Sequence, residues 1–231
     1  VLVGATMAGG DILANYQVVA QSQLKLFSTG GKLLHTIALP AIGTVGSVFG
    51  GISARDDSST AYYSFTSYLY PTTIYRLEVA DGKTSVYFKP DVRFDPSPYE
   101  TKQVFYTSKD GTRVPMFIVA KKGLKLDGSH PAVLYGYGGF GWTQTPGFDP
   151  MLQVWLEMGG VYAVPNLRGG DVYGEAWHNG GMLGNKQNVF DDFAWAAKYL
   201  IKHGYTSSRH LGIQGYSNGG LLTGASISQH P

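Results

Sequence analysis

The pattern of apolar residues changes near residue 90, and this change constrains the fold more than any other feature of the 231-residue sequence. Before it, short alternating segments rich in β-branched and aromatic residues are separated by glycine-containing turns, which predicts antiparallel hairpins. After residue 100, strand-like apolar segments alternate with helix-like ones, which predicts a parallel α/β sheet. Residues 91–100, with Pro96 and Pro98, are predicted to be the linker between the two parts.

Two predicted hairpins in the first part resemble each other. They cover residues 23–38 and 74–88, and Leu26 aligns with Leu77 at an offset of about 50 residues. The turn sequences Gly31-Lys32 and Gly82-Lys83 align at the same offset. A period near 50 with several strands in each unit is typical of propeller blades. Because a propeller needs at least about four blades to close, two blades indicate only part of one.

The second part begins with a predicted hairpin over residues 103–120 and continues with three strands and three helices. Strands are predicted at residues 131–135, 160–165 and 211–214, and helices at 151–158, 188–203 and 218–229. The helix at 188–203 is amphipathic, and its apolar side is expected to carry Phe190, Phe193, Ala197, Leu200 and Ile201.

The strongest catalytic signal lies between the last predicted strand and the last predicted helix. It is the G-x-S-x-G motif Gly215-Tyr216-Ser217-Asn218-Gly219. In a strand-turn-helix setting this motif holds the serine on a tight, strained turn that exposes its hydroxyl, and the glycines let neighbouring backbone pass close by. The motif predicts that Ser217 is a nucleophile. The alternative is an ordinary turn with a serine N-cap.

A second glycine-rich segment, Tyr135-Gly136-Tyr137-Gly138-Gly139-Phe140, directly follows a predicted strand. In α/β-hydrolases this loop contributes to the oxyanion hole, the set of fixed donors that meets negative charge as it develops. The same stretch, continued to Gly141, also matches the G-x-G-x-x-G fingerprint of dinucleotide-binding sites. That interpretation needs a helix to begin at once, and residues 142–147 are a poor helix start, so no cofactor is expected.

Three charged residues of the second part are predicted to be structural. Arg168 follows the second parallel strand and is expected to brace a loop or to be buried, although it could instead hold a substrate carboxylate. Asp191 and Asp192 are expected to open a helix, where carboxylates offset the helix dipole and cap free N–H groups.

None of the six histidines is a credible base for Ser217. In α/β-hydrolases the nucleophile comes first in the chain, followed by an acid and then by the histidine. Only His230 follows Ser217, and no Asp or Glu lies between them. His203 and His210 flank the turn before the nucleophile strand and are expected to be exposed.

Composition excludes several other classes of protein. The chain has no Cys, so it has no disulfide framework, thiolate metal site or cysteine nucleophile, and no HExxH pair is present. The net charge of +2 is too balanced for nucleic-acid binding through a basic surface. No apolar stretch approaches the roughly 20 residues that span a bilayer, and no secretory signal is visible. The cytosol is therefore the expected compartment.

Four stretches of the second part form one set: residues 134–140, 166–178, 185–193 and 217–222. Together they resemble the prolyl oligopeptidase family of serine peptidases, and the first 90 residues are compatible with the end of that family's propeller. The resemblance implies a partial α/β-hydrolase preceded by the C-terminal blades of a β-propeller. It places the blades at residues 1–91 and the N-terminal half of the peptidase domain at 92–231, ending after the turn that carries the nucleophile.

The resemblance also implies roles for individual residues. Ser217 is the nucleophile, and the backbone N–H of Asn218 and the hydroxyl of Tyr137 form the oxyanion hole. Phe140 and Asn218 contact the substrate. The family's aspartate and histidine are expected beyond residue 231, so the chain by itself is expected to be inactive.

The implied activity is a monomeric, cofactor-free serine endopeptidase that cleaves short peptides on the carboxyl side of proline through an acyl-enzyme. One alternative keeps the fold and changes the substrate, giving an esterase or another peptidase. The other alternative is a non-catalytic interaction protein built from the same two domains.

Overall fold

A computed structural model describes residues 1–46 and 51–230 and divides the chain into two units. The first unit comprises Val1–Asp95 and Thr145–Asp149, and the second comprises the remainder. The short segment Thr145–Asp149 is held within the first unit by side chains of two strands. The Thr44 hydroxyl donates to the carbonyl oxygen of Pro146 (2.7 Å), and the Phe148 N–H donates to the hydroxyl of Thr66 (3.2 Å).

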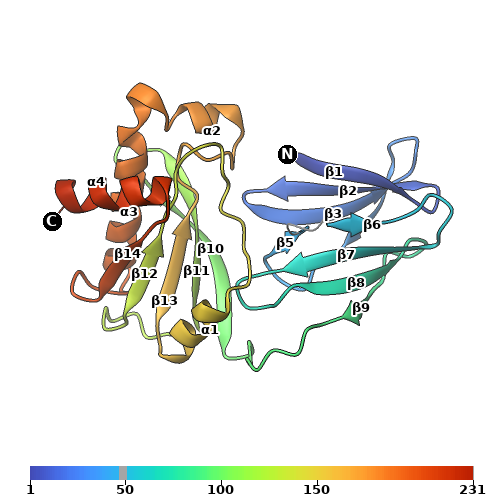
Figure 1. The fold of residues 1–231 in the computed structure, drawn as a ribbon, viewed down its shortest axis with the longest axis horizontal. Helices are drawn as coiled ribbons and strands as arrows, with labels where there is room; N and C mark the ends of the chain where they lie inside the picture. Colours follow the sequence, from blue (N-terminus) through green and yellow to red (C-terminus); the bar gives the residue numbers. More distant parts are fainter. Residues whose placement is uncertain (47–50, 231) are drawn as a thin grey trace. The chain divides into compact units, whose positions relative to one another are not determined.

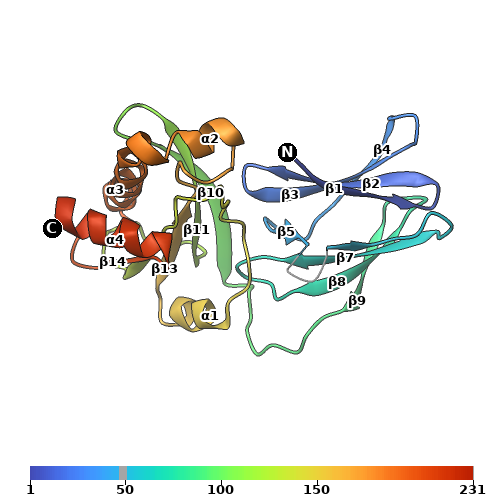
Figure 2. The same ribbon diagram turned by 45° about the horizontal axis from the view of Figure 1, so that its top comes forward.

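The first unit contains two antiparallel sheets (Figures 1 and 2). One sheet has the order β1-β2-β3-β4, and the other has β5-β7-β8-β9 with β6 also paired to β7. The strands are β1 (Leu2–Ala8), β2 (Asp11–Val18), β3 (Gln21–Phe27), β4 (Leu33–Ile37), β5 (Thr44–Val45), β6 (Ile52–Ser53), β7 (Thr60–Thr66), β8 (Thr73–Glu78) and β9 (Thr84–Phe88). Buried residues from both sheets form one apolar cluster, so the sheets pack against each other.

Both predicted hairpins are confirmed, as β3–β4 and β8–β9. The aligned residues Leu26 and Leu77 are both fully buried in the shared cluster. The aligned glycines Gly31 and Gly82 have φ angles of 83° and 69°, a region that favours glycine in tight turns. The sequence repeat therefore corresponds to two antiparallel sheets of the kind expected of propeller blades, one with four strands and one with five because β6 also pairs with β7.

The second unit contains a mixed five-stranded sheet of order β10-β11-β13-β12-β14. β12 runs parallel to both β13 and β14, whereas β10 and β11 form an antiparallel hairpin that joins the sheet through β13. The elements are β10 (Tyr99–Thr107), β11 (Arg113–Lys121), β12 (Ala132–Tyr135), α1 (Pro150–Glu157), β13 (Val161–Pro165), α2 (Glu175–Asn179), a 3₁₀ turn η1 (Leu183–Asn185), α3 (Gln187–Lys202), β14 (Leu211–Gln214) and α4 (Asn218–Gln229). Every strand and helix predicted after residue 100 is present, with small shifts at the ends.

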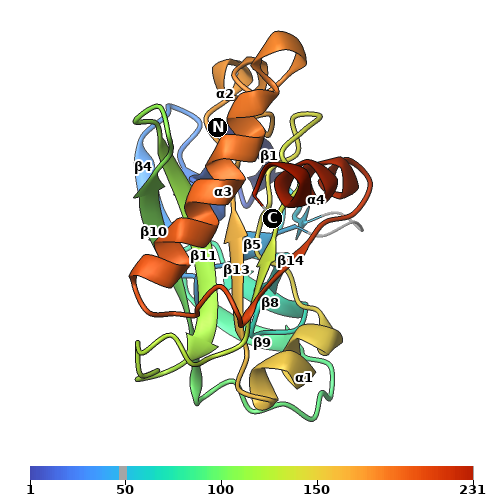
Figure 3. The same ribbon diagram turned by 90° about the vertical axis from the view of Figure 1, so that its left-hand side faces the viewer.

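The order of the parallel strands determines where a site can form. The chain moves from β12 to β13 on one side and then back past β12 to β14 on the other. Because crossovers between parallel strands are right-handed, α1 and α3 cover opposite faces, and Figure 3 shows α3 crossing one face of the sheet. In such sheets, ligands bind at the carboxyl ends of the strands where the order reverses. The loops after β12 and β14 meet at this point.

The face of α3 that packs on the core is the predicted one with one exception. Phe193 and Leu200 are buried as expected, but Ile201 is 38% exposed. The buried set is Val189, Asp192, Phe193, Ala194, Ala196 and Leu200. Phe190 and Ala197 are partly buried and pack against the same core, so only Ile201 departs from the predicted face. The buried carboxylate of Asp192 also belongs to this face, and apolar periodicity does not reveal it.

Candidate active site

Ser217 occupies a strained turn between β14 and α4. Its φ of 56° lies in the left-handed region, which non-glycine residues rarely adopt. A Cβ on Gly215 would overlap the carbonyl group of Gly219, and a Cβ on Gly219 would lie 2.5 Å from the carbonyl oxygen of Gly136. Both glycines of the motif are therefore required sterically. The turn leaves Ser217 exposed, as nucleophilic attack requires.

Asn218 is the first residue of α4 and contributes two different groups. Its backbone N–H has no acceptor within the helix, because the first N–H groups of an α-helix lack an intrahelical partner. The helix dipole also favours negative charge at this end. The side-chain amide turns the other way and donates from Nδ2 to the carbonyl oxygen of Tyr137 (2.5 Å). Asn218 thus links the turn after β14 to the loop after β12.

The loop after β12 is fixed by its neighbours. The Gly136 N–H donates to the carbonyl oxygen of Gln214 (3.0 Å), and the Gly141 N–H donates to that of Gly169 (2.9 Å). A Cβ on Gly139 would lie 2.5 Å from Nδ2 of Asn218, so the loop can approach the turn closely only with glycine there. The structure therefore brings together the segments that contain Tyr137 and Ser217.

Phe140 lies at the end of this loop with a strained backbone and an exposed side chain. Its φ is 54°, and its side chain is 80% exposed. Strained backbone positions of this kind cluster at active sites and ligand clamps, so Phe140 stays a prediction for substrate contact.

Among the described residues, no group of three or more acidic or histidine side chains is placed to hold a metal ion. No helix within the described ranges has both the length and the apolar character needed to cross a membrane. After Gly141 the chain does not form a helix until α1, so the glycine-rich loop lacks the helix that a dinucleotide fingerprint would open.

Arg168 is structural, as predicted. Its guanidinium donates to Asp192 from Nη2 (2.6 Å) and Nε (3.0 Å), and from Nη1 to Asp110 (2.5 Å). Burial opposes the charge on Arg168, but the hydrogen bonds that it donates to Asp192 and Asp110 outweigh this effect and hold the arginine pKa above its ordinary value. In return, the hydrogen bond from Arg168 lowers the pKa of Asp110 to about 2.

The predicted capping role of Asp191 and Asp192 is wrong. α3 begins at Gln187, so both residues lie beyond its first turn. Asp192 is fully buried, and besides Arg168 it accepts a hydrogen bond from the hydroxyl of Ser108 (2.6 Å). It connects α3 with the turn of the β10–β11 hairpin.

No described histidine hydrogen-bonds to Ser217. His203 and His210 are exposed, as expected. Nδ1 of His178 lies 2.8 Å from the carbonyl oxygen of Gly169, and His230 ends α4 at the opposite end from Ser217. A 12-residue helix separates the two, which amounts to about 18 Å at 1.5 Å per residue.

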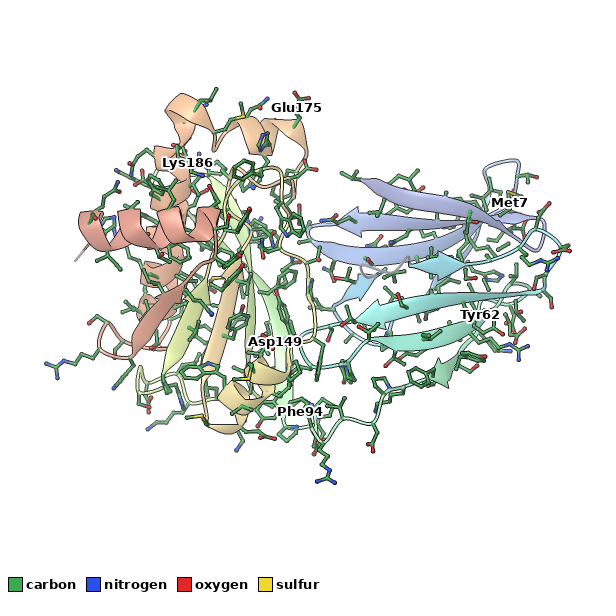
Figure 4. All side chains as sticks on the ribbon, viewed as in Figure 1. Met7, Tyr62, Phe94, Asp149, Glu175 and Lys186 are labelled. Atoms are coloured by element: carbon green, nitrogen blue, oxygen red, sulfur yellow. The ribbon has the colours of Figure 1, made fainter. Side chains whose placement is uncertain are left out.

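The sequence interpretation gave no role to Lys186, which the structure places beside the site (Figure 4). Its Nζ donates to the carbonyl oxygen of Gly138 (2.8 Å) and to Oδ1 of Asn218 (3.2 Å). Burial lowers the pKa of Lys186. One signal was available in the sequence: Lys186 lies two residues before the helix predicted at 188–203, and a cation at the start of a helix is unfavourable to the helix dipole.

Comparison with known protein families gives two matches. The sequence model of the prolyl oligopeptidase N-terminal β-propeller domain matches residues 1–90, and that of the prolyl oligopeptidase family matches residues 146–231.

Individual relatives give the same result. The chain is 48% identical over 223 residues to a prolyl endopeptidase of Elizabethkingia miricola, covering 96% of this chain and 31% of the relative. It is 37% identical to a dual function macrocyclase-peptidase of Galerina marginata, covering 95% of this chain and 30% of that protein. The chain thus spans about a third of the length of these relatives.

Solved structures agree with the sequence comparisons. A chain from a structural and mechanistic analysis of two prolyl endopeptidases superimposes with a TM-score of 0.89 at 46% identity, covering all of this chain and 33% of that one. Prolyl oligopeptidase B from Galerina marginata superimposes with a TM-score of 0.89 at 36% identity, with the same coverage. The chain belongs to the prolyl oligopeptidase family and contains part of its β-propeller followed by the start of its α/β-hydrolase peptidase domain.

Proposed function

We propose that the full-length protein containing this chain is a serine endopeptidase that cleaves short peptides on the carboxyl side of proline. The observation that carries the proposal is the strained, exposed position of Ser217 between β14 and α4, next to the Tyr137 loop. The relatives named as prolyl endopeptidases support the choice of substrate.

In the proposed reaction, Oγ of Ser217 attacks the carbonyl carbon of the proline residue and gives its proton to a histidine base. The negative oxygen of the tetrahedral intermediate accepts hydrogen bonds from the backbone N–H of Asn218 and the hydroxyl of Tyr137. The C–N bond then breaks, the base returns the proton to the leaving amine, and water hydrolyses the serine ester. Phe140 and Asn218 contact the substrate beside the scissile bond.

The base and its aspartate belong, in this proposal, to the part of the protein outside this chain. His230 is about 18 Å from Ser217 along α4. The 231-residue chain is therefore expected to be inactive on its own, and any peptide turnover by it that is lost in Ser217→Ala contradicts this expectation.

The activity is tested in the full-length protein with fluorogenic peptides that differ only in the residue before the cleaved bond. The kcat/KM for proline should exceed that for alanine or arginine by at least about tenfold, the range that pocket contacts supply. Ser217→Ala should abolish turnover. Efficient ester hydrolysis without a preference for proline would indicate an esterase, and no reaction of Ser217 with an active-site phosphonate would indicate a non-catalytic protein.

A further inference from the structure

Lys186 connects the two segments from which the proposed oxyanion hole is built. Its Nζ donates to the carbonyl oxygen of Gly138 and to Oδ1 of Asn218, while Nδ2 of Asn218 donates to the carbonyl oxygen of Tyr137. Three hydrogen bonds therefore join the loop after β12, the first residue of α4 and the start of α3. No other described side chain donates to both segments.

The position of Lys186 is unfavourable in three respects. It is the N-cap residue of α3, where the helix dipole disfavours a cation. It is half-buried, and burial lowers its pKa. Among the described residues, no carboxylate lies within ion-pair distance of it, although other lysines of the chain have such partners. Its hydrogen bonds to Gly138 and Asn218 are the interactions that offset these costs.

The bonds made by Lys186 restrain the groups that would bind the oxyanion. The carbonyl of Gly138 follows Tyr137 directly, so holding it limits rotation of the backbone that carries the phenol. The amide of Asn218 is held from both sides, by Lys186 at Oδ1 and by the carbonyl of Tyr137 at Nδ2. Since Asn218 also supplies the backbone N–H, both proposed donors are attached to backbone that Lys186 restrains.

We infer that Lys186 is a positioning residue. It holds the Tyr137 hydroxyl and the Asn218 N–H at positions from which both can donate to the oxyanion. This inference rests on the proposed function of those two groups. Lys186 acts through them and does not touch the substrate. Because misplacement of such donors by about 1 Å can reduce rate by about 100-fold, loss of Lys186 should affect the chemical step more than substrate binding.

The test uses the full-length protein with Lys186→Met, Lys186→Arg and, as a matched control, Lys202→Met at the exposed end of the same helix. Lys186→Met should lower kcat about 10- to 100-fold with little change in KM. It should reduce the rate at which a fluorophosphonate labels Ser217 by a similar factor. Lys186→Arg should recover most of both rates because a guanidinium can also donate to two acceptors, and Lys202→Met should leave both unchanged.

The labelling rate of Ser217 separates this inference from the proposed function, and the thermal midpoint separates it from loss of folding. If wild-type Ser217 is labelled but proline peptides are not cleaved, the proposed function is wrong, and the labelling rates still decide the role of Lys186.

The thermal midpoint of Lys186→Met should remain near that of Lys202→Met. If Lys186→Met does not fold, Lys186→Gln, which retains an amide donor, should lose about tenfold in labelling rate. Unchanged labelling in the folded variant, or a rise in KM alone, would overturn the inference.

Discussion

Arg168 and Asp192 form a buried ion pair that fixes how α3 packs. The two side chains form a buried ion pair at 2.6 Å, with relative side-chain exposures of 9% and 0%. A buried charge is tolerated only when its hydrogen-bonding groups are satisfied. Both oxygens of Asp192 accept from the guanidinium, and each accepts a second hydrogen bond: Oδ1 from the Ser108 hydroxyl and Oδ2 from the backbone N–H of Arg168. The pair therefore fixes the orientation of α3 against the β10–β11 hairpin.

Replacing Asp192 with Asn should destabilise the second unit by about 3 kcal/mol, because Arg168 keeps its charge in a buried site and loses its main partner. Urea unfolding of the 231-residue chain monitored by tryptophan fluorescence measures the loss. All four tryptophans lie in the second unit, so the signal reports on that unit.

The comparison variant is Asp110→Asn, which removes the other partner of Arg168. The Asp110 side chain is 45% exposed, so its loss should cost less than about 1 kcal/mol. Because its pKa is lowered to about 2, this contribution should be complete above about pH 4 and disappear as the pH falls through about 2. Equal losses for the two variants would contradict the assignment of Asp192 as the main partner.

At the scale of elements, the turn between β14 and α4 is the most predictable part of the site. The spacing of Gly215, Ser217 and Gly219 between a strand and a helix specifies both the turn and the exposed serine. The structure adds the steric reason, since each glycine faces backbone that leaves no room for a Cβ.

Gly219→Ala should therefore damage the turn, because its new Cβ would meet the carbonyl of Gly136 at the end of β12. In the full-length protein, the labelling rate of Ser217 by a fluorophosphonate should fall at least about tenfold. Gly220→Ala is the matched control: it lies one residue further along α4, and a Cβ added there would have no neighbour within 4 Å. Similar rates in the two variants would show that the crowding at Gly219 is not needed to hold the serine.

The elements also show where sequence patterns fail. Apolar periodicity predicted the existence and ends of α3 but placed Ile201 in the core and gave Asp192 a capping role. The partner of Asp192 is Arg168, 24 residues away, and a pattern within one helix contains no information about it. Lys186 was missed for a similar reason, since its acceptors lie far away in the sequence, in the loop after β12 and at the first residue of α4.

At the scale of the whole molecule, the repeat near 50 residues predicted two propeller blades with several strands each, and in both copies the structure buries the aligned leucine and turns at the aligned glycine. The return of Thr145–Asp149 to the first unit was not predicted. A five-residue segment is too short to show a periodic pattern. Its hydrogen-bond partners Thr44 and Thr66 carry no sequence signal that would mark them as partners.

Thr66→Val removes the hydroxyl that accepts from the Phe148 N–H while keeping the size of the buried side chain. Losing this hydrogen bond should raise the amide exchange rate of peptides covering residues 145–149 about tenfold, equivalent to about 1.4 kcal/mol. Thr36→Val, on the exposed side of β4, should leave the rate unchanged. No change in Thr66→Val would mean that the segment is held by other contacts.

The same five residues affect the order in which the chain can fold on a ribosome. The strands of the first unit are complete at Phe88, but its last segment is translated roughly 50 residues after the linker. At about 5–20 residues per second, this delay is on the order of 3–10 seconds. During that interval Thr44 and Thr66 have no partner from residues 145–149, so these two hydrogen bonds form only after the β10–β11 hairpin and β12 have been translated.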